Sequence, residues 1–213
     1  MILHDYVLSP SCYKIRLMAA LTGLPLELKP VNAYPGLEHR RAAFLSLNPA
    51  GTLPVLEDGP LALTETAAML VYLARHAHPA WLGSGQPADD AQIAQWLAFA
   101  QRLTTYLGDA RQHDMFGTSG DIGALRFNGI VALRELEAAL AERRFFGGTF
   151  LVGEGPTIAD IACFPFVALA PDGGVSLDPY PSMRLWMRAI RSLPGFIEMP
   201  GIHRLHDLKP EPA

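Results

Sequence analysis

The chain has 213 residues, of which 50% are hydrophobic and 18% are charged, a balance that is typical of a folded globular protein and excludes a disordered one. A formal net charge of −4, with no run of arginine or lysine longer than two residues, excludes the basic surface that nucleic-acid binding requires. The uncharged stretch 161–171 is too short to cross a bilayer, and no basic segment followed by an apolar one opens the chain, so we expect a cytoplasmic protein without a membrane partner.

The first part of the chain alternates between extended and helical patterns. The expected elements are a strand over residues 1–7, a turn over 9–12, a helix over 13–21 that Gly23 and Pro25 end, and a second strand over 26–31. A strand, a helix and a second strand in this order form the opening of a thioredoxin-like domain.

A proline interrupts the next extended segment, which runs from Asn48 to Leu56. Pro54 follows Leu53 and has no amide hydrogen to donate to a sheet, so the backbone must turn or kink there. If the bond between them is cis, the unpaired amide and carbonyl of Leu53 face outward and can pair with an extended, peptide-like ligand. The alternative is an ordinary turn at a proline.

A helix is expected to begin near Glu65, because residues 67–74 combine good helix propensity with apolar side chains. Its free amides and positive dipole end would lie beside the Glu65 carboxylate and the Thr66 hydroxyl. Such a group suits a ligand that carries both an amino group and a carboxylate. The alternative is a capping cluster that serves only the helix.

The clearest linker composition lies between about residues 77 and 90, where proline and glycine are frequent. Beyond it, apolar residues recur at helical spacing and predict two core faces, one formed by Ile93, Trp96, Leu97, Ala100, Leu103 and Leu107 and the other by Ile130, Leu133, Leu136 and Leu140. Between these faces, residues 109–121 contain two glycines and predict a mobile loop.

Residues 155–161 place Thr157 and Asp160 at the spacing of a reciprocal helix cap, which predicts a structural role at a buried helix start. Together with the segments 48–56 and 180–196 and the pair Glu65-Thr66, this motif resembles the soluble glutathione transferase superfamily in its bacterial theta, zeta and beta-like members. The resemblance covers nearly the whole chain and rests on the order and spacing of the motifs.

The resemblance implies an α/β plus all-α architecture. A thioredoxin-like, glutathione-binding domain would span residues 1–78, a linker 79–88 and an all-helical domain 89–213, and the protein would form a homodimer.

The resemblance also implies a glutathione site. In the family, the residue before the cis-proline pairs through its backbone with the cysteinyl part of glutathione, and an acid-serine pair at the next helix grips the γ-glutamyl head. The matching positions here are Leu53, Pro54, Glu65 and Thr66, with His39 and Thr52 at the glycine end. Thr66 keeps the hydroxyl of the usual serine. The alternative for His39 is the solvated start of a charged helix.

In the theta, zeta and beta branches, the catalytic serine or cysteine lies at the first turn of the first helix. Alignment on that helix implies Ser9, with Ser11 and Cys12 as close competitors. The electrophilic substrate would lie against the helical domain, and the expected lining is Tyr106, His113, Met115 and Phe116. The alternative is a surface loop without a substrate role.

The cysteines and histidines predict neither a disulfide nor a metal site. Cys12 and Cys163 fall in different predicted domains, so both are expected to be free thiols, with Cys163 a core residue. No histidine pair joins cysteines or carboxylates at zinc spacing, and His203 and His206 belong to a polar tail.

The function implied is that of a detoxifying glutathione S-transferase, with glutathione as co-substrate and a small hydrophobic electrophile as the second substrate. A serine hydroxyl and the helix dipole would favour the thiolate of glutathione. The alternatives are a glutathione-dependent isomerase or a thiol-disulfide reductase that uses Cys12, and a non-catalytic interaction protein on the same fold.

Overall fold

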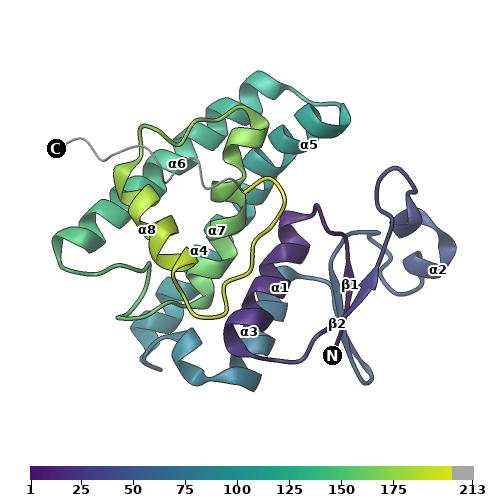
Figure 1. Ribbon diagram of the computed structural model, residues 1–213, viewed down its shortest axis with the longest axis horizontal. Helices are drawn as coiled ribbons and strands as arrows, with labels where there is room; N and C mark the ends of the chain where they lie inside the picture. The colour runs from purple at the N-terminus through teal and green to yellow at the C-terminus, as the bar shows by residue number, and fades with distance from the viewer. Residues whose placement is uncertain (203–213) are drawn as a thin grey trace.

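The structure is a computed structural model that describes residues 1–202. His203 and His206, in the polar tail named above, lie outside the described residues. Within this range the strands lie at one side of the molecule and the long helices at the other, with α1 (Pro10–Thr22) and α3 (Thr66–Ala77) between them (Figure 1). The predicted combination of a small α/β layer and a helical region is confirmed.

The sheet has four strands in the order β2-β1-β3-β4. Their bounds are Ile2–Asp5 for β1, Glu27–Pro30 for β2, Val55–Asp58 for β3 and Leu61–Leu63 for β4. β1 pairs in parallel with β2 and antiparallel with β3. Parallel neighbours need a crossover connection, and α1 provides it. The predicted order of strand, helix and strand is therefore confirmed.

The first helix begins at Pro10, earlier than the sequence predicted. Ser9 is its N-cap, because its side chain accepts a hydrogen bond from the amide of Cys12, and proline is tolerated at the next position, where its missing amide hydrogen has no partner to lose. Gly23 ends the helix in the left-handed region, with a φ of 68°, as predicted. The expected turn over 9–12 is thus the first turn of α1, and Ser9 lies at the positive end of the helix.

The described chain beyond β4 is helical. Its elements are α3, η2 (Pro79–Leu82), α4 (Pro87–Leu103), η3 (Thr104–Gly108), α5 (Asp109–Phe116), α6 (Ile122–Phe145), α7 (Ile158–Ala168), η4 (Ala170–Gly173) and α8 (Pro181–Arg191), while η1 (Glu38–Arg40) and α2 (Ala42–Leu45) lie between β2 and β3. The expected linker holds η2 and the start of α4, and the division into two domains stays a proposal. Over residues 1–202, no helix combines the length and the apolar composition needed to cross a membrane.

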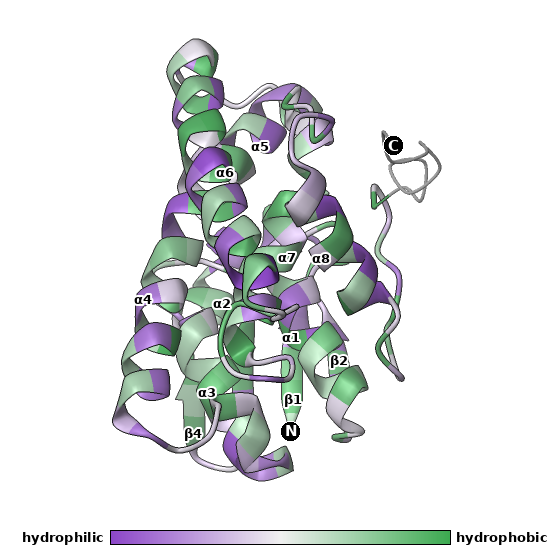
Figure 2. Cartoon of the chain, turned by 90° about the vertical axis from the view of Figure 1, so that its left-hand side faces the viewer, coloured by the Kyte–Doolittle hydropathy of each residue, from purple (hydrophilic) through white to green (hydrophobic). Residues whose placement is uncertain are grey.

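The two predicted apolar faces belong to the core. On α4 and η3 the buried members include Ile93, Ala100 and Leu103, and on α6 they include Leu133 and Leu136. Figure 2 shows the polar residues of α4 on its outer side. Helix α7 is buried along its whole length, since α1 packs on one side of it and α4 on another. Cys163 lies within it as a free, buried thiol, as predicted.

The reciprocal cap at the start of α7 is confirmed. The Asp160 carboxylate accepts hydrogen bonds from the amide of Thr157 at 2.9 Å and from its hydroxyl at 3.2 Å. It also accepts from the amide of Leu151 at 3.0 Å and from the indole N–H of Trp186 in α8 at 2.8 Å. Asp160 has no exposed surface. The carboxylate therefore joins α7 to two other parts of the helical region.

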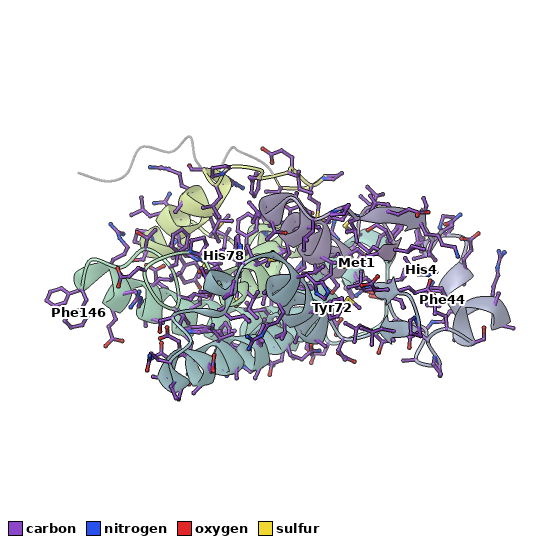
Figure 3. The ribbon with its side chains drawn as sticks, turned by 90° about the horizontal axis from the view of Figure 1, so that it is seen from below. Met1, His4, Phe44, Tyr72, His78 and Phe146 are labelled. Carbon is purple, nitrogen blue, oxygen red and sulfur yellow. The ribbon has the colours of Figure 1, made fainter. Side chains whose placement is uncertain are left out.

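A small second core holds the α2 segment on the sheet. The ring of Phe44 in α2 packs edge-on against His4 in β1, with 5.9 Å between ring centroids, and the two side chains lie together in Figure 3. Leu53 packs against the same cluster. This packing places Leu53 and α2 in a defined position beside the sheet.

Residues 109–116 form a helix, so the first half of the predicted loop over 109–121 is wrong. The glycines that suggested a loop come after it, and Gly117 ends α5 with a φ of 66°. Helix α5 continues α4 through η3, a π-helical turn. At the end of that turn, an added Cβ on Gly108 would lie 2.8 Å from the Phe166 ring, so glycine allows close contact with α7.

Candidate active site

A cavity of about 640 Å³ lies where the sheet end meets the helical region. One wall is the loop after β1 with the first turn of α1, and a second consists of the η1 segment and residues 51–53. The third runs from η3 to residue 118 and includes the Phe166 ring of α7. Among the described residues, the lining contains two arginines, Arg40 and Arg111, and no carboxylate, in a chain whose formal net charge is −4.

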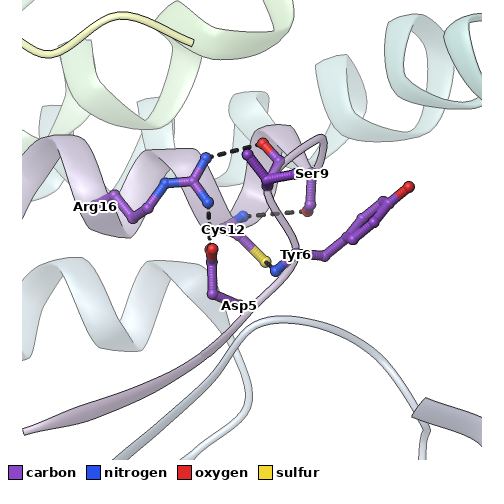
Figure 4. Close-up of polar contacts among 6 residues, drawn as sticks. Asp5, Tyr6, Ser9, Cys12 and Arg16 are labelled. Carbon is purple, nitrogen blue, oxygen red and sulfur yellow. Dashed lines mark hydrogen bonds and ion pairs between the residues drawn. The ribbon is translucent and has the colours of Figure 1, made fainter. Parts of the chain in front are cut away.

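Ser9 lines this cavity at the start of α1. Its Oγ accepts the Cys12 amide hydrogen at 3.2 Å (Figure 4), and its own amide donates to the carbonyl of Tyr6 at 2.9 Å. Among the described residues, the one group in reach of the hydroxyl hydrogen of Ser9 is Cys12 Sγ, a buried and protonated thiol and hence a weak acceptor. The hydroxyl can therefore donate to a ligand at the positive end of a helix. Ser11 lines the same wall.

Cys12 lies behind this wall and has no exposed surface. Its Sγ accepts the amide hydrogen of Tyr6 at 3.4 Å, as Figure 4 shows. Burial raises the pKa of Cys12 to about 12, despite the opposing hydrogen bond with Ser9. The thiol stays protonated at neutral pH and does not line the cavity, which argues against a reactive role.

Two arginines hold the loop that precedes Ser9. Arg16 of α1 pairs with Asp5 at the end of β1 and donates to the carbonyl of Val7 at 3.0 Å (Figure 4). Arg111 of α5 donates to the next carbonyl, that of Leu8, at 3.0 Å. The position of Ser9 is thus set from both the sheet and the helical region.

The Leu53–Pro54 peptide bond is cis, which is one of the two conformations expected at this proline. Leu53 lines the cavity, and neither its amide nor its carbonyl bonds to another described residue, whereas Pro54 is buried and does not line it. The buried side chain of Asn48 holds the loop before them, because it donates to the carbonyl and the hydroxyl of Thr52, each at 2.9 Å. Thr52 also lines the cavity.

His39 and Arg40 line the cavity from η1. The Nδ1 atom of His39 is buried and has no partner among the described residues. Burial, and then the charge of Arg40, lower the pKa of His39, so the ring is neutral at neutral pH. The Arg40 guanidinium donates to the carbonyl of Ala50 at 3.3 Å, next to Gly51 and Thr52. The predicted glycine-end residues therefore lie together, and Arg40 joins them.

Glu65 and Thr66 do not line the large cavity. They line a separate small cavity of about 30 Å³ with Lys14 of α1 and Gln101 of α4. Glu65 occupies the N-cap position of α3, yet its side chain makes no capping hydrogen bond. The alternative in which Glu65 serves only to cap the helix is therefore wrong. Lys14 is buried, and burial lowers its pKa to about 8.

Of the residues predicted to contact the electrophile, only Phe116 lines the cavity. Tyr106 packs on the core, His113 pairs with Asp114 at 3.2 Å, and Met115 is 40% exposed elsewhere on α5. The residues that do line this wall follow helical spacing, and they are Thr104, Gly108, Arg111, Gln112 and Phe116. The sequence contains this helical spacing, but it was missed because residues 109–121 were predicted to form a loop.

The rings of Tyr34 and Phe116 meet across the cavity, with 4.4 Å between their centroids. Tyr34 comes from the loop after β2 and Phe116 from the end of α5. Contact between these rings joins two walls of the cavity. Over residues 1–202, no group of three or more histidines, cysteines, aspartates or glutamates is arranged to hold a metal ion.

Comparisons with known proteins agree with this architecture. Family models for the glutathione S-transferase N-terminal and C-terminal domains match residues 8–76 and 132–189. Glutathione S-transferase 2 of Anopheles gambiae is 32% identical over 192 residues and covers 88% of each chain. Maleylacetoacetate isomerase of Pseudomonas aeruginosa is 32% identical over 193 residues, which are 85% of this chain and 87% of that one.

A solved glutathione S-transferase from Pseudomonas fluorescens superimposes with a TM-score of 0.84 at 32% identity and covers 93% of this chain and 98% of its own. Similarity of this extent spans both the sheet and the helical region. The chain therefore belongs to the glutathione S-transferase family.

Proposed function

We propose that the protein is a glutathione S-transferase that activates the glutathione thiol with Ser9 and presents the thiolate to an electrophile. The observation that carries this proposal is the position of the Ser9 hydroxyl, at the positive end of α1, on a cavity that is also lined by Leu53 with its unpaired backbone. These are the two groups that a thiol-containing peptide needs, one for its sulfur and one for its backbone.

In this proposal the backbone of Leu53 pairs with the cysteinyl residue of glutathione. The γ-glutamyl head extends to the start of α3, where the Glu65 carboxylate accepts from the amino group and the Thr66 hydroxyl and amide bind the carboxylate. The glycine carboxylate lies near His39, Thr52 and Arg40. Support comes from the unpartnered Nδ1 of His39 and from the uncapped start of α3.

The chemistry follows from the state of the sulfur. A free thiol has a pKa of about 8.5, so only a few per cent is thiolate at neutral pH. A hydrogen bond donated by Ser9 and the dipole of α1 both favour the charged form, and a fall of about one pKa unit corresponds to about 1.4 kcal/mol. The thiolate then forms a bond to the electrophilic carbon, and the leaving group departs with the electron pair of the broken bond. The Phe116 and Phe166 rings supply apolar contacts for that substrate.

A second candidate is a glutathione-dependent isomerase, which the relative named as a maleylacetoacetate isomerase favours. Such an enzyme uses the same thiolate, which adds to a double bond and leaves again, so glutathione is not consumed. A reductase that uses Cys12 is disfavoured, because this thiol is fully buried and burial raises its pKa to about 12. Net consumption of glutathione during turnover separates transferase from isomerase.

The proposal includes a homodimer, because two-fold pairs are the common assembly of this family and of soluble oligomers in general. The chain has a mass of 23.2 kDa, so sedimentation equilibrium at micromolar concentration is expected to give about twice that value. A measured mass equal to that of one chain would contradict the dimer.

The experiment that tests the function is calorimetric titration with glutathione. The wild type is expected to bind, and Glu65→Gln is expected to bind about ten- to a hundredfold more weakly, because it removes a charge-assisted hydrogen bond worth roughly 1.5 to 3 kcal/mol. Glu142→Gln, an exposed change on α6 away from the cavity, is the matched control and should bind as the wild type does. No binding by the wild type would leave only the non-catalytic alternative.

A further inference from the structure

Arg111 is a buried cation on the wall of the cavity that the helical region supplies. It is 3% exposed, and its side chain reaches two acceptors far away in the sequence. Its Nε donates to the Asp172 carboxylate at 3.1 Å, and its Nη1 donates to the carbonyl of Leu8 at 3.0 Å. The bond to Asp172 of η4 and the bond to Leu8 therefore hold the guanidinium beside the loop that ends at Ser9.

These bonds use only part of the guanidinium. It has five N–H donors, and the contacts with Asp172 and Leu8 occupy two of them. The Nη2 atom has no acceptor among the described residues, yet it is not among the buried, unpartnered polar atoms, so it keeps a surface open to the cavity that Arg111 lines. One edge of the guanidinium is thus fixed by protein and another faces the space beside Ser9.

The surroundings of that free edge favour an anion. Within residues 1–202, no carboxylate lines the cavity, and Asp172, the one counter-charge there in contact with Arg111, is not part of the lining. Burial raises the pKa of Tyr6, a second residue that lines the cavity, and the positive charge of Arg111 opposes that rise. The charge of Arg111 is therefore felt inside the cavity. An arginine side chain held in this way loses little rotamer freedom when it binds a ligand. Its planar guanidinium can donate two parallel hydrogen bonds to the two oxygens of a carboxylate.

We infer that the free edge of Arg111 binds a carboxylate on the electrophilic substrate, so that the preferred electrophile is an unsaturated or activated monocarboxylic acid. Partial neutralisation by Asp172 suits a single negative charge better than a doubly charged phosphate. Arg40 and His39, on the opposite wall, are the groups proposed for glutathione, which leaves Arg111 for the second substrate.

This inference rests on the proposed function, because it needs a thiolate beside Ser9. With an alkene acid, the thiolate sulfur bonds to one alkene carbon, the π electrons move to the other carbon, and water protonates that carbon. Only glutathione and the alkene are consumed. Arg111 orients the acid and does not exchange a proton.

The test uses two Michael acceptors with nearly the same alkene, monomethyl fumarate, which carries a carboxylate, and dimethyl fumarate, which does not. The rates of the purified protein are divided by the uncatalysed rates with glutathione. The wild type is expected to favour the acid. Arg111→Met is expected to lose about ten- to a hundredfold more normalised kcat/KM on the acid than on the diester, whose own loss reports the missing bond from Arg111 to the Leu8 carbonyl.

Two further variants separate binding from a structural role. Arg111→Lys keeps the charge without the fork and should retain part of the preference for the acid. Asp172→Asn removes the counter-charge but leaves the bond to Leu8, and it should keep or strengthen that preference. If Arg111 only held the Ser9 loop, its loss would slow both acceptors alike.

Equal losses on the two acceptors, or a matching loss of glutathione affinity in Arg111→Met by calorimetry, would overturn the inference while leaving the transferase function intact. Absence of any glutathione-dependent turnover of both acceptors by the wild type would overturn the proposed function itself, and this inference with it. A selective loss on the acid, with glutathione affinity preserved, supports it.

Discussion

Replacing Ser9 with alanine is expected to lower glutathione conjugation about ten- to a hundredfold at neutral pH while glutathione affinity stays nearly unchanged. The affinity should hold because the peptide is gripped by Leu53, Glu65 and Thr66 in this proposal. The thiolate loses a charge-assisted hydrogen bond worth roughly 1.5 to 3 kcal/mol, so its pKa rises toward the free value of about 8.5. Activity should therefore recover as the pH is raised through that value.

Ser9 is also the N-cap of α1, so loss of the cap must be separated from loss of the donor. Alanine at an N-cap costs about 0.5 to 2 kcal/mol in stability, whereas glycine costs only a few tenths. Ser9→Gly should therefore remain close to wild-type stability and still lose activity. Ser9→Thr keeps the hydroxyl and should retain most of the conjugation activity.

The measurement is the thiolate absorbance of bound glutathione, followed against pH in the wild type and in both hydroxyl-free variants. A parallel series with Ser11→Ala serves as the control, because Ser11 lines the same wall without capping the helix through its side chain. An unchanged thiolate titration in Ser9→Ala would show that Ser9 is not the donor and would move the role to Ser11.

Replacing Asp160 with alanine is expected to destabilise the protein by about 3 kcal/mol or more without a direct effect on chemistry. The carboxylate is fully buried and accepts from the Thr157 amide and hydroxyl, the Leu151 amide and the Trp186 indole. Each donor left unpaired in a dry interior costs about 1 to 3 kcal/mol, although such losses do not add in full. For a chain of this size, the Tm should fall by roughly 6 to 12 °C.

The matched control is Asp121→Ala, the same substitution at an exposed cap, where Asp121 accepts the Ala124 amide at 3.0 Å at the start of α6. It should lose only about 1 kcal/mol. Thermal unfolding of both variants, with glutathione affinity measured on the folded fraction, checks the prediction. An Asp160→Ala protein that melts like the wild type but no longer turns over substrate would assign Asp160 to the chemistry instead.

The sequence by itself predicted the features that depend on local spacing and local chemistry. Gly23 and Pro25 marked the end of the first helix, the interval from Thr157 to Asp160 predicted a reciprocal cap, and the order of strand, helix and strand predicted the sheet layer. These features involve residues a few positions apart, so their geometry is set by backbone dihedrals and hydrogen bonds that the local sequence controls. The apolar stripes of α4 and α6 were readable for the same reason.

Only the tertiary structure decided which side chains reach the cavity. The rotation of α5 about its axis turns Arg111 and Phe116 inward and His113 and Met115 away, and α5 is held in this orientation by its packing against η3, η4 and α6. The neighbours of Arg111 make the same point, because its bond to Leu8 joins residues 103 positions apart. Burial of Cys12 likewise depends on the elements packed around it. Contacts between distant segments select the working face of a helix, and no local pattern encodes them.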